Sequence, residues 1–321
     1  MRVLSGVQPS GKLHLGNYFG AMKQHLQLQQ EHECLYFIAE YHALTSLRNP
    51  NVLRRYSLDV ALDYLALGLD SEKTIFFRQS DVPQVTQLAW LLSTVTPMGL
   101  LERCVSYKDK LARGLPADHG LFAYPVLQAA DILIYDSQLV PVGQDQVQHI
   151  EVTRDIAQKF NNTYGEVFVL PKPRVMADTA IVPGLDVQKM SKSYGNTIEL
   201  FEPEKSIRKK VMKIVTDSTP VEDPKDPAKC NVFALLKLLA QPDETARWRK
   251  KYEAGGMGYG EAKKRLAELI VSHFRSARQK REELEKDPGA VEEVLRSGAA
   301  RARSLADKTL QRVRKACGLN P

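Results

Sequence analysis

Residues 3–17 read Val-Leu-Ser-Gly-Val-Gln-Pro-Ser-Gly-Lys-Leu-His-Leu-Gly-Asn. The apolar run at 3–7 predicts a short buried strand, Gln-Pro-Ser-Gly predicts a turn, and a helical pattern begins near Gly16. Glycines let backbone N–H groups approach a phosphate closely, and the N-terminus of the following helix adds partial positive charge. His14 and Asn17 share one side of that helical turn and can both donate hydrogen bonds. The stretch indicates a nucleotide-binding unit; a plain helix start with a surface histidine is the alternative.

Strand and helix patterns alternate beyond this stretch. Apolar runs predict strands at 35–39, 74–78 and 139–142, and helical periodicity covers 16–30, 53–67, 121–135 and 145–161. Pro171, Pro173, Pro183 and Gly184 are typical of loops. The expected fold class is α/β, with a Rossmann-type parallel sheet that binds nucleotide and a C-terminal all-helical domain. In such sheets, ligands bind at the carboxyl ends of the strands, near the topological switch point.

A domain boundary is expected near Glu202–Pro203, because strand signals end there. Residues 1–202 would form the α/β nucleotide-binding domain, and residues 203–321 a helical region. Helical patterns in this second part cover 204–215, 232–239, 261–286 and 290–319, and a polar, proline-rich loop covers 217–230.

Composition is that of a globular protein. The chain has 321 residues, of which 43% are hydrophobic and 26% charged. We expect neither a membrane span nor a secretory leader, because apolar runs of the required length are lacking. The four cysteines are too far apart for a zinc ribbon or a redox pair, so we expect free thiols and a cytoplasmic protein. No metal site is predicted.

The net charge of +7 is unevenly distributed. Residues 244–321 contain 19 Lys and Arg but 11 Asp and Glu, which leaves the preceding part close to neutral. A basic C-terminal part favours binding of a polyanion such as nucleic acid, although a solvated helical surface would have the same composition.

A second motif, Lys189-Met190-Ser191-Lys192-Ser193, follows a predicted loop. Its lysines suit the negative charge that develops on a leaving pyrophosphate, and such charge stabilisation accelerates a reaction without a covalent nucleophile. A basic surface loop is the alternative. Together with His14 and Asn17, the motif indicates one ATP site built from two distant stretches.

Asp131 interrupts an apolar helix, Tyr124-Pro-Val-Leu-Gln-Ala-Ala-Asp-Ile-Leu133. A buried carboxylate is costly without a partner. The residues alone leave open whether Asp131 caps a neighbouring helix, pairs with an arginine or binds a substrate.

The two motifs, in this order and spacing, resemble those of class I aminoacyl-tRNA synthetases, and Gly6-Val7-Gln8-Pro9-Ser10-Gly11 resembles the tryptophanyl-tRNA synthetases. The resemblance covers nearly the whole chain. It implies a ligase of protein biosynthesis that converts L-tryptophan and ATP to tryptophanyl-adenylate and transfers the amino acid to tRNA(Trp). It also implies that residues 1–202 are the catalytic domain, with the ATP and tryptophan site, and that the helical region 203–321 binds the anticodon of the tRNA. Mg²⁺ carried by ATP, a homodimer and no membrane partner are implied as well.

The resemblance assigns residues to three groups. The catalytic group is His14, Asn17, Lys110, Lys189 and Lys192. The ATP-binding group is Gln8, Pro9, Ser10, Gly16, Asn17, Gly143, Gln144, Asp145, Val182, Lys189, Met190, Ser191, Lys192 and Ser193. The tryptophan-binding group is Leu4, His42, Tyr124, Gln128, Asp131, Val140, Val142 and Gln146, with Asp131 accepting the indole N–H and Tyr124 and Gln146 binding the ammonium group. His149 is interpreted as a packing histidine.

The chain departs from the family pattern at Leu4, Gln128 and Gln144, and also at Tyr194-Gly195-Asn196, which follows the lysine motif in place of an acidic residue. Gln128 bears on selectivity, because a polar group near the ring is also found in tyrosyl-tRNA synthetases. The alternatives are therefore a tyrosyl-tRNA synthetase, a small-molecule nucleotidylyltransferase, and a non-charging paralogue that binds tRNA or tryptophan as a regulator. The second would not need the basic helical part, and the third would not need His14, Asn17, Lys189 and Lys192.

Overall fold

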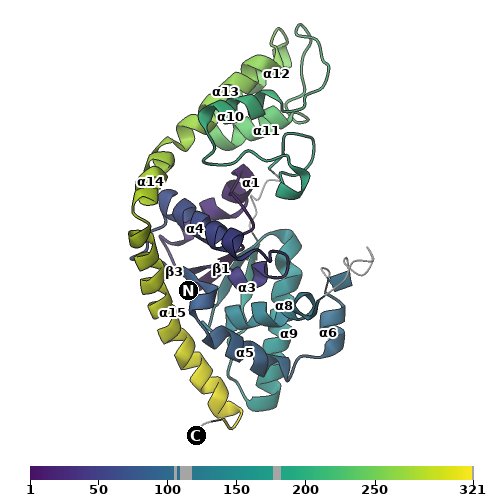
Figure 1. Cartoon of the computed structure of the whole chain (residues 1–321). Helices are drawn as coiled ribbons and strands as arrows, with labels where there is room; N and C mark the ends of the chain where they lie inside the picture. Colours follow the sequence, from purple (N-terminus) through teal and green to yellow (C-terminus); the bar gives the residue numbers. More distant parts are fainter. Residues whose placement is uncertain (105–106, 109–117, 176–181, 320–321) are drawn as a thin grey trace. The chain divides into compact units, whose positions relative to one another are not determined.

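The computed structural model describes residues 1–104, 107–108, 118–175 and 182–319, with the side chain of Asp145 left out. Contacts divide the chain into two compact units (Figure 1). The first unit consists of residues 1–11, 26–177 and 284–321. The second consists of residues 12–25 and 178–283.

The first unit is built on a five-stranded parallel sheet in the order β3-β2-β1-β4-β5. The strands are β1 (Arg2–Val7), β2 (Glu33–Ile38), β3 (Ile75–Arg78), β4 (Leu139–Val142) and β5 (Lys172–Val175). The order reverses between β1 and β4, so the topological switch point lies at the carboxyl ends of these two strands. This confirms the Rossmann-type α/β class expected from the sequence.

Helices surround this sheet and supply its core. They are α3 (Glu40–Ala43), α4 (Pro50–Ala66), η2 (Gln79–Asp81), α5 (Gln84–Ser93), α6 (Met98–Glu102), α8 (His119–Leu133), η3 (Gln144–Gln146), α9 (Val147–Tyr164) and α15 (Pro288–Ala316). Helix α8 packs against α5 and α9, and buried residues of β1, β2 and β3 join α5, α8 and α9 in one apolar cluster.

The last helix, α15, belongs to the first unit and runs along β3 and α5 (Figure 1). Its buried stripe is made of small and aliphatic residues, including Ala299, Ala302 and Ala306, which join the core cluster. Three arginines dock it further: Arg301 donates to the carbonyl of Ser71, Arg303 donates to that of Asp81, and Arg312 pairs with Asp136. Part of the C-terminal basic charge therefore stabilises this unit.

The second unit is helical. Its elements are α1 (Leu15–Asn17), η1 (Tyr18–Met22), the start of α2 (Lys23–Leu28), η4 (Lys192–Tyr194), α10 (Glu204–Met212), α11 (Asn231–Leu239), α12 (Pro242–Ala254), α13 (Tyr259–His273) and most of α14 (Arg275–Lys286). Helix α13 packs against α10 and α11. Tyr18 of the π-helical turn η1 contacts His273 and Phe274 edge to face, so the first helical stretch is joined to the end of α13.

Several expectations about the elements were wrong in detail. β5 contains Pro173, which was interpreted as a loop signal; a proline is tolerated here because β5 is an edge strand. The single helix expected over 261–286 is two helices with a break at Phe274. Helix α12 was not predicted. The boundary expected near residue 202 lies inside the second unit, and the assignment of 203–321 to anticodon binding stays a prediction.

None of the helices in the described ranges has both the length and the apolar character needed to cross a membrane.

Candidate active site

A buried carboxylate lies where the carboxyl ends of β2 and β3 meet α8. Asp131 of α8 is 2% exposed. His42 of α3, the helix after β2, places its Nε2 atom 2.8 Å from Asp131 Oδ2. Gln79, the residue after β3, places its Nε2 atom 2.8 Å from Oδ1 and 2.9 Å from Oδ2. Asp131 thus has the partners that a buried carboxylate needs, and they are neither an arginine nor a helix terminus.

A second polar chain leads from the same region toward β4. The hydroxyl of Tyr124 lies 2.8 Å from His149 Nε2, and His149 Nδ1 lies 2.7 Å from Gln146 Oε1. An Nδ1–H that donates to the Gln146 carbonyl leaves Nε2 to accept from Tyr124. The ring of Tyr124 also meets that of His42 edge to face, with centroids 6.5 Å apart. The hydrogen bonds around Asp131 and those from Tyr124 to His149 and Gln146 therefore lie side by side.

The apolar residues predicted to line the tryptophan pocket come from adjacent strands. Leu4 of β1 and Val140 of β4 are buried, and Val142 of β4 is partly buried against the same cluster. Gln128 of α8 is half-buried. These residues lie in the first unit with Asp131, so the structure gathers the predicted tryptophan-binding group into one unit.

The turn after β1 and the turn after β4 lie at the switch point. In the first, the amide of Ser10 donates to the carbonyl of Gln8 at 2.9 Å, and Gly11 has a φ of 116°. In the second, Gly143 and Gln144 lead into η3 and α9, and Gln146 N donates to the Gly143 carbonyl at 2.9 Å. Both turns belong to the predicted ATP-binding group. Pro9 is buried between its exposed neighbours.

In the second unit, the two distant motifs lie beside each other. The amide of Leu15 donates to the carbonyl of Ile198 at 3.0 Å, and that of Leu200 donates to the carbonyl of Leu13 at 3.0 Å. Gly16 marks the closest approach, because a Cβ at this position would lie 2.9 Å from His14 Nδ1 and 3.4 Å from Met190 Cβ. Residues far apart in sequence are thus brought together, as the ATP-site hypothesis requires.

His14 is 5% exposed, and its backbone N–H donates to the Asn17 side-chain oxygen at 3.1 Å. Burial lowers the pKa of the His14 imidazole to about 4, and the positive charge of Lys192 contributes to the shift. His14 is therefore neutral near pH 7. It can act as a hydrogen-bond partner, while Lys192 provides the charge.

The loop with the two lysines is held by a buried amide. Asn196 is 3% exposed; its Oδ1 accepts from Ser191 N at 2.7 Å, and its Nδ2 donates to Asp186 Oδ1 at 2.7 Å and to the Lys189 carbonyl at 3.1 Å. Ser191 in turn accepts from the amide of Ser193.

Two buried apolar residues, Met190 and Val182, also hold this loop in place. Met190 N donates to the carbonyl of Val182 at 2.8 Å, and both residues are 3% exposed. The side chain of Lys189 is exposed and that of Lys192 is half-buried. Lys110 lies outside the described residues, as does the side chain of Asp145.

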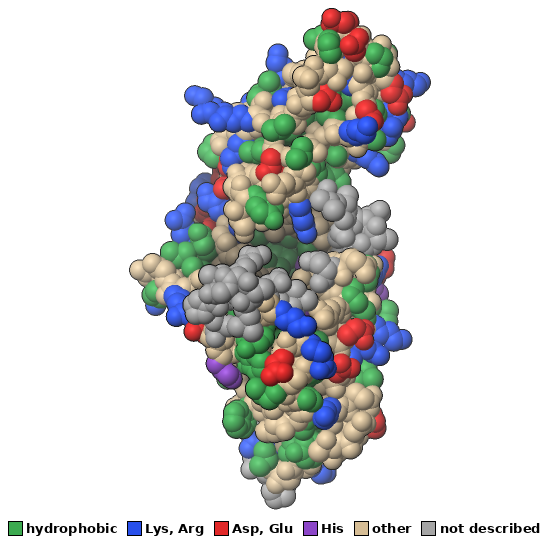
Figure 2. All heavy atoms as spheres, turned by 90° about the vertical axis from the view of Figure 1, so that its right-hand side faces the viewer, with side chains coloured by type: hydrophobic (Ala, Val, Ile, Leu, Met, Phe, Trp, Pro, Cys, Tyr) green, Lys and Arg blue, Asp and Glu red, His purple; other side chains and the backbone are tan. Residues whose placement is uncertain are grey.

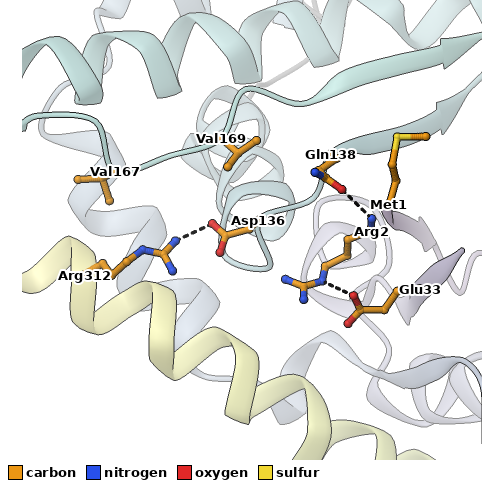
Figure 3. A pocket seen from close by; sticks show the side chains of 8 residues that line it. All are labelled: Met1, Arg2, Glu33, Asp136, Gln138, Val167, Val169 and Arg312. Atoms are coloured by element: carbon orange, nitrogen blue, oxygen red, sulfur yellow. Dashed lines mark hydrogen bonds and ion pairs between the residues drawn. The ribbon is translucent and has the colours of Figure 1, made fainter.

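A cavity of about 560 Å³ lies elsewhere in the first unit (Figure 3). It opens at the amino ends of the strands, where Arg2 pairs with Glu33 and Arg312 of α15 pairs with Asp136. The charged residues that line it are already paired with one another, and none of the predicted site residues contributes to it. The cavity therefore lies apart from the predicted site residues, which follow the carboxyl ends of the strands.

The profile of the family described as tRNA synthetases class I (W and Y) matches residues 1–275. The chain belongs to this family. A tryptophan–tRNA ligase from Rhodopirellula baltica is 58% identical over 319 residues, covering 99% of this chain and 100% of the relative. A tryptophan–tRNA ligase from Fusobacterium nucleatum is 53% identical, covering 99% of this chain and 98% of the relative. The family resemblance seen in the sequence is thereby confirmed.

Solved structures of tryptophanyl-tRNA synthetases are similar to this chain along nearly its whole length. The tryptophanyl-tRNA synthetase from Campylobacter jejuni complexed with ADP and tryptophan has a TM-score of 0.93 at 51% identity, covering 99% of this chain and 100% of that one. The enzyme from Mycoplasma pneumoniae has a TM-score of 0.85 at 32% identity, covering 99% and 98%.

The sequence predicts no organising role for three residues that make such contacts in the structure, which are Gln79, His149 and Asn196. Gln79 gave no signal, because a glutamine after a short strand has no distinctive pattern. His149 lies three residues after Gln146, one helical turn away, and this spacing could have suggested a contact. Asn196 was noticed only as a departure from the family pattern, although a buried amide can replace an acidic residue in organising a loop.

Proposed function

We propose that this chain is a tryptophan–tRNA ligase. It activates L-tryptophan with ATP to form tryptophanyl-adenylate and pyrophosphate, and then transfers the tryptophanyl group to tRNA(Trp). The structural observation that carries the proposal is the buried Asp131, held by His42 and Gln79 beside an apolar wall. Relatives of the same length with this activity, at 58% and 53% identity, support it.

Asp131 is proposed to accept the indole N–H of the substrate. A site built to pair with a substrate N–H rejects an analogue that lacks it by about 10⁴–10⁵, because the buried acceptor is otherwise left unpaired. Leu4, Val140, Val142 and Gln128 are proposed to line the space around the ring. The chain of Tyr124, His149 and Gln146 offers oxygen acceptors for the substrate ammonium group.

ATP is proposed to bind the two groups of residues assigned to it. The residues proposed to bind ATP are Gln8, Pro9, Ser10, Gly143, Gln144 and Asp145, together with Gly16, Asn17, Val182 and Lys189–Ser193. The substrate carboxylate attacks the α-phosphorus, the bond to pyrophosphate breaks, and the charge that develops on pyrophosphate is stabilised by Lys189 and Lys192. Neutral His14 and Asn17 add hydrogen bonds, and Lys110 is proposed to contribute a further positive charge.

Mg²⁺ is proposed to arrive with ATP. The phosphate-binding side chains of the second unit are amines, an amide and an imidazole, whereas Mg²⁺ prefers carboxylate, phosphate and water oxygens. These residues therefore suit the phosphate oxygens directly, and the metal would be held by ATP itself.

The tRNA is proposed to bind basic surface of the helical region. Figure 2 shows Lys and Arg side chains over the part of the surface formed by α10–α13, with acidic side chains among them. Such contacts fix the position of a nucleic acid more than they read its sequence. The cytoplasmic location fits the four cysteines, which are free thiols.

The protein is also proposed to be a homodimer. Trp90 of α5 is 71% exposed and Met98 at the start of α6 is 63% exposed, and Figure 2 shows hydrophobic side chains gathered on the first unit. Large aromatic residues and methionine are enriched at protein interfaces. Sedimentation of the purified protein, with Trp90→Lys as the variant, tests this assignment.

The deciding experiment is amino-acid-dependent exchange of pyrophosphate into ATP, followed by charging of purified tRNA. Exchange with tryptophan and charging of tRNA(Trp) are expected. Exchange with tyrosine in place of tryptophan would make the chain a tyrosyl-tRNA synthetase. Absence of both activities would favour the non-charging regulator.

A further inference from the structure

Gln79 is the buried residue that holds Asp131 from the side of β3. We propose that Gln79 is a positioning residue, an inference that rests on the proposed function. It fixes the Asp131 carboxylate so that one lone pair of Oδ1 faces the indole N–H of the substrate. Gln79 thereby sets selectivity for tryptophan without touching the reacting atoms.

The orientation of the Gln79 amide is determined by its second partner. The side chain is 1% exposed, and its Oε1 accepts from the backbone N–H of Tyr41 at 2.9 Å. Because a backbone N–H can only donate, the oxygen must face Tyr41 and the NH₂ group must face Asp131. Gln79 is therefore a donor to the carboxylate, and the amide cannot turn over without losing both contacts.

The donors around Asp131 leave a defined vacancy. A carboxylate offers about four lone-pair directions. Oδ2 accepts from His42 and from Gln79, whereas Oδ1 accepts from Gln79 alone. Within the described ranges, the remaining direction is therefore on Oδ1. An indole N–H is a single donor and matches this single acceptor position.

The segment that carries Gln79 is itself anchored at both ends. Arg78 pairs with Glu292 of α15 and with Asp81, and Ser80 donates to Glu40 at the start of α3. Glu40 also accepts from Ser57 of α4 at 2.8 Å. The turn after β3 is thus tied to α3, α4 and α15 by contacts that do not involve Asp131.

Gln79→Met tests the role, because methionine has similar length and lacks both polar groups. Gln29→Met is the matched control. Gln29 is also buried, donates to the carbonyl of Gly68 at 3.0 Å and accepts from the amide of Asp70 at 3.0 Å, but it does not contact Asp131. Both variants lose comparable hydrogen bonds, so an effect on selectivity that is confined to Gln79→Met is not one of stability.

The readout is pyrophosphate exchange with tryptophan and with its benzothienyl analogue, in which sulfur replaces the indole N–H. For Gln79→Met we expect KM for tryptophan to rise about tenfold with kcat nearly unchanged, and the preference over the analogue to fall by a similar factor. Gln29→Met should keep the preference of the original protein. An unchanged preference in Gln79→Met would overturn the proposal.

Gln79→Glu gives a second measurement that remains decisive if the methionine variant fails to fold. It retains the acceptor for Tyr41 N–H but places a second carboxylate against Asp131, so the two would share a proton. Other titratable groups that the structure describes as interacting with Asp131 are His42 and Tyr135. We expect kcat/KM for tryptophan, relative to the original protein, to improve below about pH 6. A pH profile parallel to that of the original protein would contradict the inference.

The outcomes separate this inference from the proposed function. If the original protein does not use tryptophan, the proposed function fails. If it does, and Asp131→Ala loses the preference over the analogue while Gln79→Met keeps it, the role of Gln79 alone is wrong.

Discussion

Gly298 of α15 lies directly against the backbone of Phe76 in β3. A Cβ at this position would lie 1.9 Å from the carbonyl oxygen of Phe76, far inside van der Waals contact. The obstacle is the backbone of a strand, so no side chain can rotate away. The close approach of α15 to the edge strand therefore depends on this one glycine.

Gly298→Ala is expected to destabilise the protein by about 1–3 kcal/mol, the usual cost of forcing extra volume into a packed interior. Thermal unfolding measures this. The matched control is Gly260→Ala in α13, where nothing lies within 4 Å of the added Cβ. The control should be neutral or slightly more stable, because alanine favours a helix over glycine by about 0.5–1 kcal/mol. Equal melting temperatures for the two variants would show that α15 can shift away from β3 without loss of stability.

The stability of the protein should depend on two buried histidines in acid. Burial lowers the pKa of His25 to about 4, and burial together with Lys192 does the same for His14. The unfolded chain binds these protons near pH 6.5, whereas the folded protein stays neutral until about pH 4. Since the unfolded state binds more protons in this window, stability falls as the pH falls, by about 1.4 kcal/mol per pH unit and histidine.

Urea unfolding at several pH values between these limits measures the slope. His25→Gln should make it shallower, whereas replacement of the exposed His119 by Gln should leave it unchanged. The same slope in His25→Gln and in the original protein would mean that His25 is protonated in the folded state.

The positive charge of Lys192 is expected to act on the leaving pyrophosphate. Lys192→Ala should lower kcat for pyrophosphate exchange by about 10²–10³, the usual loss when one charge-stabilising group is removed. KM for tryptophan should change little, because Lys192 is proposed to act on the leaving pyrophosphate and not on the amino acid. Lys205→Ala, which removes an exposed lysine of α10, is the control. A rise in KM with constant kcat would assign Lys192 to substrate binding instead.

The sequence predicted those parts of the fold whose local pattern is strong. The strand at Val3–Val7 and its turn follow from apolar residues and from Pro9 and Gly11, which interrupt any regular element. The strand that contains Pro173 was not predicted, because proline lacks the backbone N–H that a strand normally donates. Only the order of the strands shows that β5 is an edge strand, where this donor is not needed.

The sequence predicts which residue types form the site better than it predicts which of them contact one another. Asp131 in an apolar helix requires a partner wherever it lies, and this much follows from its charge. Its partners lie 89 and 52 residues away at His42 and Gln79, and only the arrangement of strands brings them together. For α15, the basic composition favours a polyanion-binding or a solvated helical surface, whereas the structure buries the alanines at 299, 302 and 306 in the core and packs the helix against β3.

Asn196 is expected to set how well the lysine loop is ordered. Asn196→Ala removes the acceptor for Ser191 N and the donors to Asp186 and to the Lys189 carbonyl, and leaves the first of these groups without its partner. The loop should then sample other conformations, so kcat for pyrophosphate exchange should fall about tenfold while KM for tryptophan stays nearly constant.

The control for this loop is Asn162→Ala, which removes an exposed asparagine of α9 whose side chain accepts a hydrogen bond from Gln158 at 2.9 Å. It should leave both constants unchanged. The double variant Asn196→Ala with Lys192→Ala should lose little more than Lys192→Ala alone, because Asn196 acts by placing the lysines. If the two losses instead multiply, Asn196 contributes to catalysis by a route independent of Lys192, and its role as an organiser of the loop is wrong.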